Sequence, residues 1–285
     1  MLVVKNPTWL RVGDPPPRTL VDARLQLHHA AQIIVSAAIS YVAPRADDSH
    51  TALTWIGPAG ALATESITAE RDARIALRLE DLSLHVLDGG EEATAPFALP
   101  ARTTREAYTW LTEAVGILGL DAARLTPRKH YTIPDHPVAG GAPFSTDIGS
   151  AVAELARYWS NAAAVLDQTA RVTPGASAVR TWPHHFDIAT LILLPESGTS
   201  GRRTIGVGQS PGDNSYAEPY WYVGPYPYPA TTAFPPLAGS GHWHTEGWVG
   251  AALPASDFVA AKDQQAQVAA FVESGIAACR MLLGG

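Results

Sequence analysis

The segment GHWHTEG, residues 241–247, places two histidines and a glutamate at alternate positions. In a β-strand such residues point to one face, so the side chains of His242, His244 and Glu246 are expected to project together. The Cα atoms of residues two apart in a strand lie about 6.7 Å apart, which lets two imidazoles bind one metal ion. Glu246 starts about 13 Å from His242 along the strand, so it joins that ion only if the strand bends. A supporting or proton-transferring role for its carboxylate fits the spacing equally well.

A second group of candidate ligands lies in WPHHFD, residues 182–187. Read as a strand, this segment places His185 and Asp187 on one face and His184 and Phe186 on the other. A strand that offers His and Asp beside a strand that offers two His would form a nitrogen-and-oxygen site, suited to iron, zinc, manganese or nickel. The expected ligands of a divalent ion, iron or zinc first, are His184, His185, His242 and His244, with Asp187 and Glu246 as the catalytic carboxylates. The alternative is a hydrogen-bonded cluster that only stabilises the fold.

The segment SPGDNSYAEPYWYVGPYPYP, residues 210–229, begins acidic and becomes aromatic. Ligand pockets combine aromatic walls with a few polar groups, so Glu218, Tyr220 and Tyr222 are candidate substrate-binding residues. The competing interpretation is an edge strand whose prolines prevent further pairing.

Two other features have weaker functional implications. GQSPG, residues 208–212, matches the G-x-S-x-G pattern of serine hydrolases. The oxyanion hole of those enzymes uses the backbone N–H of the residue after the serine, and Pro211 has none. The remaining histidines stand alone in helices, strands or loops, where structural roles are commoner. They include His28, His29 and His85.

The composition excludes several classes of protein. The chain of 285 residues has a formal net charge of −7, so it lacks the excess of basic residues that is typical of nucleic-acid-binding proteins. Cys279 is the only cysteine, which excludes an intrachain disulfide and a thiolate zinc cluster. No apolar run approaches the roughly 20 residues of a membrane span, and the first residues do not resemble a secretory signal. We therefore expect a cytoplasmic protein that binds a small molecule. Its oligomeric state is left open.

The order of elements predicts an α+β fold of antiparallel sheets flanked by long helices. Helical spacing of apolar residues, without Gly or Pro inside, predicts a helix over 19–43, and a threonine cap before a second apolar run predicts one over 103–119. Alternating apolar residues between them predict strands over 50–68 and 73–88. The second half repeats the order: helices are expected over 149–172 and 260–284, and strands over 181–194, 202–209, 218–228 and 241–253.

This repetition suggests an internal duplication. TWIGPAGALAT (54–64) and TWPHHFDIAT (181–190) each stand at the start of the strands. The expected organisation is two similar helix–sheet–helix lobes, residues 1–125 and 148–285, joined by a Pro/Gly-rich linker over 126–147. The candidate ligands all lie in the second lobe, so its chemistry is expected there.

The chain also resembles a family of functionally uncharacterised bacterial proteins. The resemblance rests on Leu27-His28 at the start of a helix and on Phe186-Asp187-Ile188-Ala189 after the second long helix. It covers most of the chain in the order of elements. Small residues stand in the family at the positions of His184 and His185, and the resemblance implies no activity.

Two functions follow from these features. The first is a metal-binding protein, a metal-dependent enzyme that activates water or oxygen on a small molecule. The alternative is a non-enzymatic protein that binds a small molecule or a partner through a Tyr/Trp-lined pocket and whose histidines are structural.

Overall fold

The computed structural model confirms the α+β fold. It describes residues 9–89, 91, 92, 94–195 and 201–284, which form four α-helices and two antiparallel sheets. The chain divides into two compact units. Unit 1 comprises Met1–Arg18, Arg157–Val179 and Asp187–Gly285, and unit 2 comprises Thr19–Ala156 and Arg180–Phe186.

Unit 2 is a meandering antiparallel sheet with two helices. Its strands follow the order β1-β2-β3-β4-β5, with β6 also beside β4. The elements are α1 (Val21–Tyr41), β1 (Thr54–Ile56), β2 (Ala61–Ala63), β3 (Ala73–Arg78), β4 (Ser83–Asp88), β5 (Glu91–Glu92), β6 (Phe97–Ala98), α2 (Thr104–Ile117) and β7 (Arg180–Trp182).

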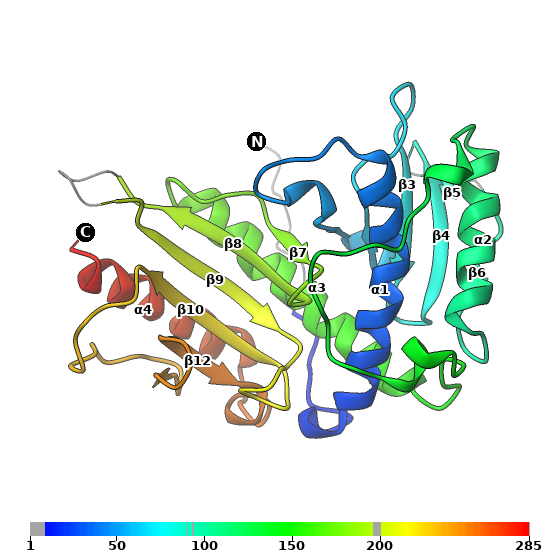
Figure 1. Cartoon of the computed structure of the whole chain (residues 1–285). Coiled ribbons are helices and arrows are strands. Elements are labelled where there is room, and N and C mark those ends of the chain that lie inside the picture. Colours follow the sequence, from blue (N-terminus) through cyan, green and yellow to red (C-terminus); the bar gives the residue numbers. More distant parts are fainter. Residues whose placement is uncertain (1–8, 90, 93, 196–200, 285) are drawn as a thin grey trace, which may run out of the picture. The chain divides into compact units, whose positions relative to one another are not determined.

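The helix α1 forms the core of unit 2 because it is apolar on nearly every side. Ala31, Ile34 and Ala38 have no exposed surface, and the helix packs against β3 and α2 (Figure 1). A helix with so much buried surface owes its stability mainly to tertiary packing. The predicted helix over 19–43 is therefore confirmed within about two residues at each end.

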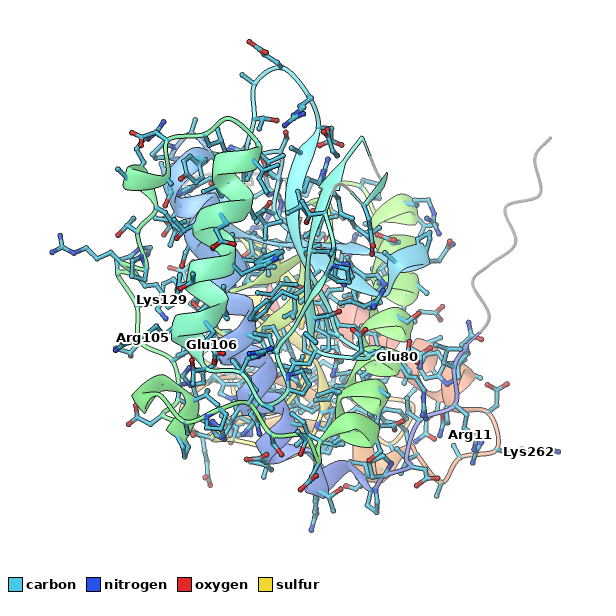
Figure 2. All side chains as sticks on the ribbon, turned by 90° about the vertical axis from the view of Figure 1, so that its right-hand side faces the viewer. Arg11, Glu80, Arg105, Glu106, Lys129 and Lys262 are labelled. Atoms are coloured by element: carbon cyan, nitrogen blue, oxygen red, sulfur yellow. The ribbon has the colours of Figure 1, made fainter. Side chains whose placement is uncertain are left out.

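The start of α2 has the expected threonine cap. Thr103 is the N-cap, and its hydroxyl accepts a hydrogen bond from the backbone N–H of Glu106 at 3.3 Å. The Glu106 carboxylate in turn accepts from the backbone N–H of Thr103 at 2.8 Å, which completes a capping box. Figure 2 labels Arg105 and Glu106 in this first turn.

Unit 1 contributes five strands to a six-stranded antiparallel sheet and packs helices against them. The order of its strands is β11-β12-β10-β9-β8, and α4 packs against β10, β9 and β12. Figure 1 shows α3 and α4 on the same side of this sheet. The elements are α3 (Gly149–Val172, within unit 1 from Arg157), β8 (Asp187–Leu193), β9 (Thr204–Ser210), β10 (Tyr220–Tyr226), β11 (His242–His244), β12 (Gly250–Pro254) and α4 (Gln264–Leu282).

The central strand β10 separates the two faces of this sheet. Trp221 and Val223 point toward the helices, and a Cβ added at Gly275 of α4 would meet Val223 at 2.9 Å. Tyr220 and Tyr222 therefore point to the opposite face. The register pairs Tyr222 with Ala252 and Ala252 with His242, so His242 shares that opposite face.

The units differ from the predicted lobes. Residues 126–147 lie within unit 2 instead of linking two lobes, and 180–186 return to unit 2. The two TW segments adjoin one another: Leu53, just before β1, pairs with Thr181 of β7 through backbone hydrogen bonds of 2.9 and 2.8 Å. The strand orders also differ, because β12 lies beside β10 and β11 forms the edge.

Replacing Thr103 with Ala should destabilise unit 2 by about 1 kcal/mol, because the orphan N–H groups of α2 lose their cap. Thr112→Ala is the matched control. Thr112 lies on the exposed side of the same helix, where Ala is the better helix former. Urea denaturation of both variants measures the difference, and equal midpoints would contradict the role of the cap.

Candidate functional site

His242 and His244 converge on one atom. In β11 their side chains project together, and both approach the hydroxyl of Tyr216: Nε2 of His242 lies 2.9 Å from Tyr216 Oη and Nδ1 of His244 lies 3.1 Å from it. The second nitrogen of His244, Nε2, lies 2.7 Å from the backbone carbonyl oxygen of Glu246. Glu246 thus enters this site through its backbone.

These contacts fix the direction of every hydrogen bond in the group. A carbonyl oxygen only accepts, so Nε2 of His244 carries a proton and donates it to Glu246. In the neutral ring, Nδ1 of His244 then accepts from Tyr216, whose single proton is used there. Nε2 of His242 must therefore donate to Tyr216. Burial and the nearby Asp213 and Asp257 raise the pKa of Tyr216, which keeps the phenol protonated, as this series of hydrogen bonds requires.

The described residues contain no group of three or more His, Cys, Asp or Glu side chains that could hold a metal ion. The predicted strand over 181–194 is wrong in its first part, because residues 183–186 form a turn between β7 and β8. The backbone N–H of Phe186 donates to the carbonyl of Trp182 at 2.7 Å, and Phe186 adopts a positive φ of 58°. Alternation therefore does not set the directions of His184 and His185.

His184 and His185 are neighbours in unit 2. Their ring centroids lie 4.4 Å apart, and the ring of Tyr131 lies 5.9 Å from that of His184. Burial, and then the proximity of His185, lower the pKa of His184. The imidazole of His184 therefore remains neutral at physiological pH.

The turn at 183–186 is held by a buried histidine. Nε2 of His28 donates to the carbonyl of Pro183 at 2.8 Å, and the amide of Gln32 donates to the same oxygen at 2.9 Å. The His28 ring stacks on Phe186 with centroids 4.9 Å apart and planes 5° apart. The two segments that carry the family resemblance, Leu27-His28 and Phe186-Asp187, thus meet at this stack.

The tyrosines of β10 are paired with carboxylates. Tyr220 donates to Oδ2 of Asp213 at 2.6 Å, and Tyr222 donates to Oδ2 of Asp187. Burial and the adjacent carboxylates raise the pKa of both phenols, so both remain donors. Glu218 is separate from this group. It is buried and binds Arg18 at 3.1 Å and the backbone N–H of Ser256 at 2.7 Å.

Glycines let these rings lie against the sheet. A Cβ at Gly208 would meet the hydroxyl of Tyr222 at 2.5 Å, so only glycine allows Tyr222 to cross β9 and reach Asp187. A Cβ at Gly250 would meet the ring of Trp248 at 2.7 Å. Side chains at these two positions, on the strands that flank β10, would otherwise fill this space.

Trp248 completes the group and was missed in the sequence, where it follows the glycine of GHWHTEG. Its ring stacks on His244 with centroids 4.2 Å apart, and its N–H donates to Ser215 at 3.1 Å. The rings of Tyr216 and Tyr220 lie 4.8 Å apart. We name the resulting set the aromatic platform: Tyr216, Tyr220, Tyr222, His242, His244 and Trp248.

Comparison with protein-family models, with curated proteins and with solved structures gives no match for this chain. None of the helices in the described ranges has the length and hydropathy that crossing a bilayer requires. Function is therefore inferred from the geometry of the sites.

The buried His28 predicts loss of stability in acid. Burial lowers its pKa to about 4, against 6.5 for an ordinary histidine. The unfolded chain then binds the proton more readily, so stability falls as the pH drops from about 6.5 to about 4, by about 3 kcal/mol in total. His28→Gln keeps an N–H donor for Pro183 and should flatten the dependence in this window. Chemical denaturation across the pH range measures it, and an unchanged slope would refute the assignment.

Proposed function

We propose that unit 1 is a binding module for a small organic molecule, which it takes on the aromatic platform. The ligand has an apolar ring face and hydrogen-bond donors, either hydroxyl groups or an amine. The observation that carries this proposal is the combination of stacked rings and tyrosine–carboxylate pairs over glycines, on the face of the sheet opposite to α4.

The rings support stacking of a ligand. His244 and Trp248 are half-buried and His242 is exposed, so part of the platform remains accessible. Ring pairs add about 0.5–1.5 kcal/mol beyond the burial of their area. Hydrogen bonds to Glu246 and Ser215 hold the rings of His244 and Trp248 in place. Such pre-ordering lowers the entropic cost of binding.

The polar groups of the platform favour a ligand that donates. Asp213 is exposed, and its Oδ1 accepts from the backbone of Ser215 at 2.7 Å while Oδ2 accepts from Tyr220. Carboxylates only accept, and aromatic faces attract positive charge. Hydroxyl and ammonium groups match both features, whereas an anionic ligand would be repelled.

The metal-dependent enzyme is the second candidate, and one observation favours it. His242 and His244 point at a single atom, as two ligands of one ion would. A metal at that point would have to displace the hydroxyl of Tyr216 and reverse the tautomer of His242. It would also need further donors, for which His184, His185, Asp187 and Glu246 are the sequence-derived candidates.

Ligand-observed NMR tests the proposal. A fragment library of hydroxylated rings and aromatic amines is screened against the full chain, and the best fragment is titrated against variants. Trp248→Ala and Tyr220→Phe should each weaken it about tenfold, because each removes a stacking surface or a polar contact. Trp110→Ala is the matched control, since it removes a tryptophan from α2 of unit 2.

Three outcomes would overturn the proposal. The first is a screen without any binder, and the second is a fragment whose affinity Trp248→Ala leaves unchanged. The third is a stoichiometric metal, found by elemental analysis of untagged protein and lost in His244→Ala. That result would establish the metal site instead.

A further inference from the structure

Unit 2 contains a cavity of about 580 Å³ on its own sheet. This volume lies within the range of small-molecule sites, about 300–1,000 Å³. Ala61 and Ala76 form the floor and Leu87 and Pro58 the apolar sides. The polar lining consists of Arg78, Glu80, Asp81, His85 and Glu92. Figure 2 labels Glu80.

The cavity exists because small side chains meet on neighbouring strands. Ala76 of β3 pairs with Ala63 of β2 and with His85 of β4, so these side chains share one face of the sheet. Leu77 of β3 points to the other face, where it is fully buried. Larger residues at Ala61 or Ala76 would fill the space.

A chain of polar contacts lines one end of the cavity. Nδ1 of His85 lies 2.7 Å from Oε1 of Glu92, and its Nε2 lies 2.7 Å from the hydroxyl of Ser83. Ser83 donates to Oδ1 of Asp81 at 2.6 Å. Asp81 also binds Nε of Arg78 at 3.0 Å.

The hydrogen bond of Ser83 to Asp81 decides the role of one nitrogen of His85. Burial acts to raise the pKa of Asp81, but hydrogen bonds from Arg78 and Ser83 outweigh it and lower that pKa, so Asp81 is ionised and only accepts. The one proton of Ser83 goes to Asp81, and His85 therefore donates to Ser83 through Nε2.

This assignment excludes Ser83 as the nucleophile of a catalytic triad. Ser83, His85 and Glu92 have the order of contacts of a Ser–His–Glu triad, but a triad histidine must accept the serine proton. The nitrogen of His85 that faces Ser83 is a donor, and Ser83 is buried and does not line the cavity. This series of hydrogen bonds instead fixes the carboxylates of Asp81 and Glu92 at the wall of the cavity.

We propose that this cavity binds an organic amine with an apolar body. Arg78 is paired with Asp81, and His85 contacts Glu92. Glu80 adds a further carboxylate, so the lining holds three carboxylates against one arginine. An ammonium group donates to the second oxygen of Glu92 while the body packs on the apolar lining of the cavity. The side chains of Asp81 and Glu92 are 45% and 48% exposed, so a ligand can reach them.

Isothermal titration of the full chain with three probes of similar shape tests this inference. 2-Phenylethylamine carries a positive charge, 2-phenylethanol none and 3-phenylpropanoate a negative charge. The amine should bind, the alcohol about tenfold more weakly and the carboxylate not measurably, because charge-assisted hydrogen bonds to Glu92 distinguish them.

Two variants test whether the amine binds in this cavity. Glu92→Gln should weaken it about tenfold, and Ala76→Leu should abolish binding by filling the floor. Glu113→Gln is the matched control, because it removes the same charge from the exposed side of α2. All titrations are made in the Trp248→Ala background, so that the aromatic platform offers no second stacking site for the ring of the probes. Glu92→Gln keeps the test valid if Ala76→Leu fails to fold.

Any of three results would overturn the inference. These are no binding of the amine, equal binding of amine and alcohol, and equal weakening by Glu92→Gln and Glu113→Gln.

Discussion

The packing of α4 on β10 is the constraint on which the rest of unit 1 depends. Trp221 and Val223 are buried toward the helices, and each such side chain contributes about 1.5–3 kcal/mol of stability. A strand alternates its side chains, so burying these two directs Tyr220 and Tyr222 to the other face. Gly275 permits the close approach of the helix. The position of the aromatic platform thus follows from apolar packing on the far side of the same strand.

In both units the direction of hydrogen bonds decides what a histidine can do. The backbone carbonyl of Glu246 assigns the tautomer of His244, and through Tyr216 it assigns that of His242. The carboxylate of Asp81, acting through Ser83, makes Nε2 of His85 a donor. Distances alone would suggest a metal site in the first case and a catalytic triad in the second. The directions of the hydrogen bonds indicate that these histidines hold neighbouring groups in place instead.

Small residues give each unit its candidate binding surface. Gly208 and Gly250 allow the rings of Tyr222 and Trp248 to lie on the sheet of unit 1. In unit 2 the alanines at 61 and 76 leave a cavity beside a chain of charged groups. A buried polar group is tolerated only when it is hydrogen-bonded, and Tyr222 of unit 1 and His85 of unit 2 meet that condition through Asp187 and Glu92. The two surfaces differ in what they offer a ligand: stacked rings in one, a negatively charged wall in the other.

The sequence by itself determined the elements and the shared face of His242 and His244, since helical spacing, capping and strand alternation are local properties. The helix over 149–172 and the cap at Thr103 are confirmed for this reason. Only the tertiary structure decided what the histidines contact. The sequence places residues 183–186 in a strand, but they form a turn. His28 and Gln32, more than 150 residues away along the chain, bind the carbonyl of Pro183 in this turn. Tyr216 reaches His242 from a separate loop, and His85 contacts Ser83 and Glu92. Such partners are set by long-range packing, which no local spacing encodes.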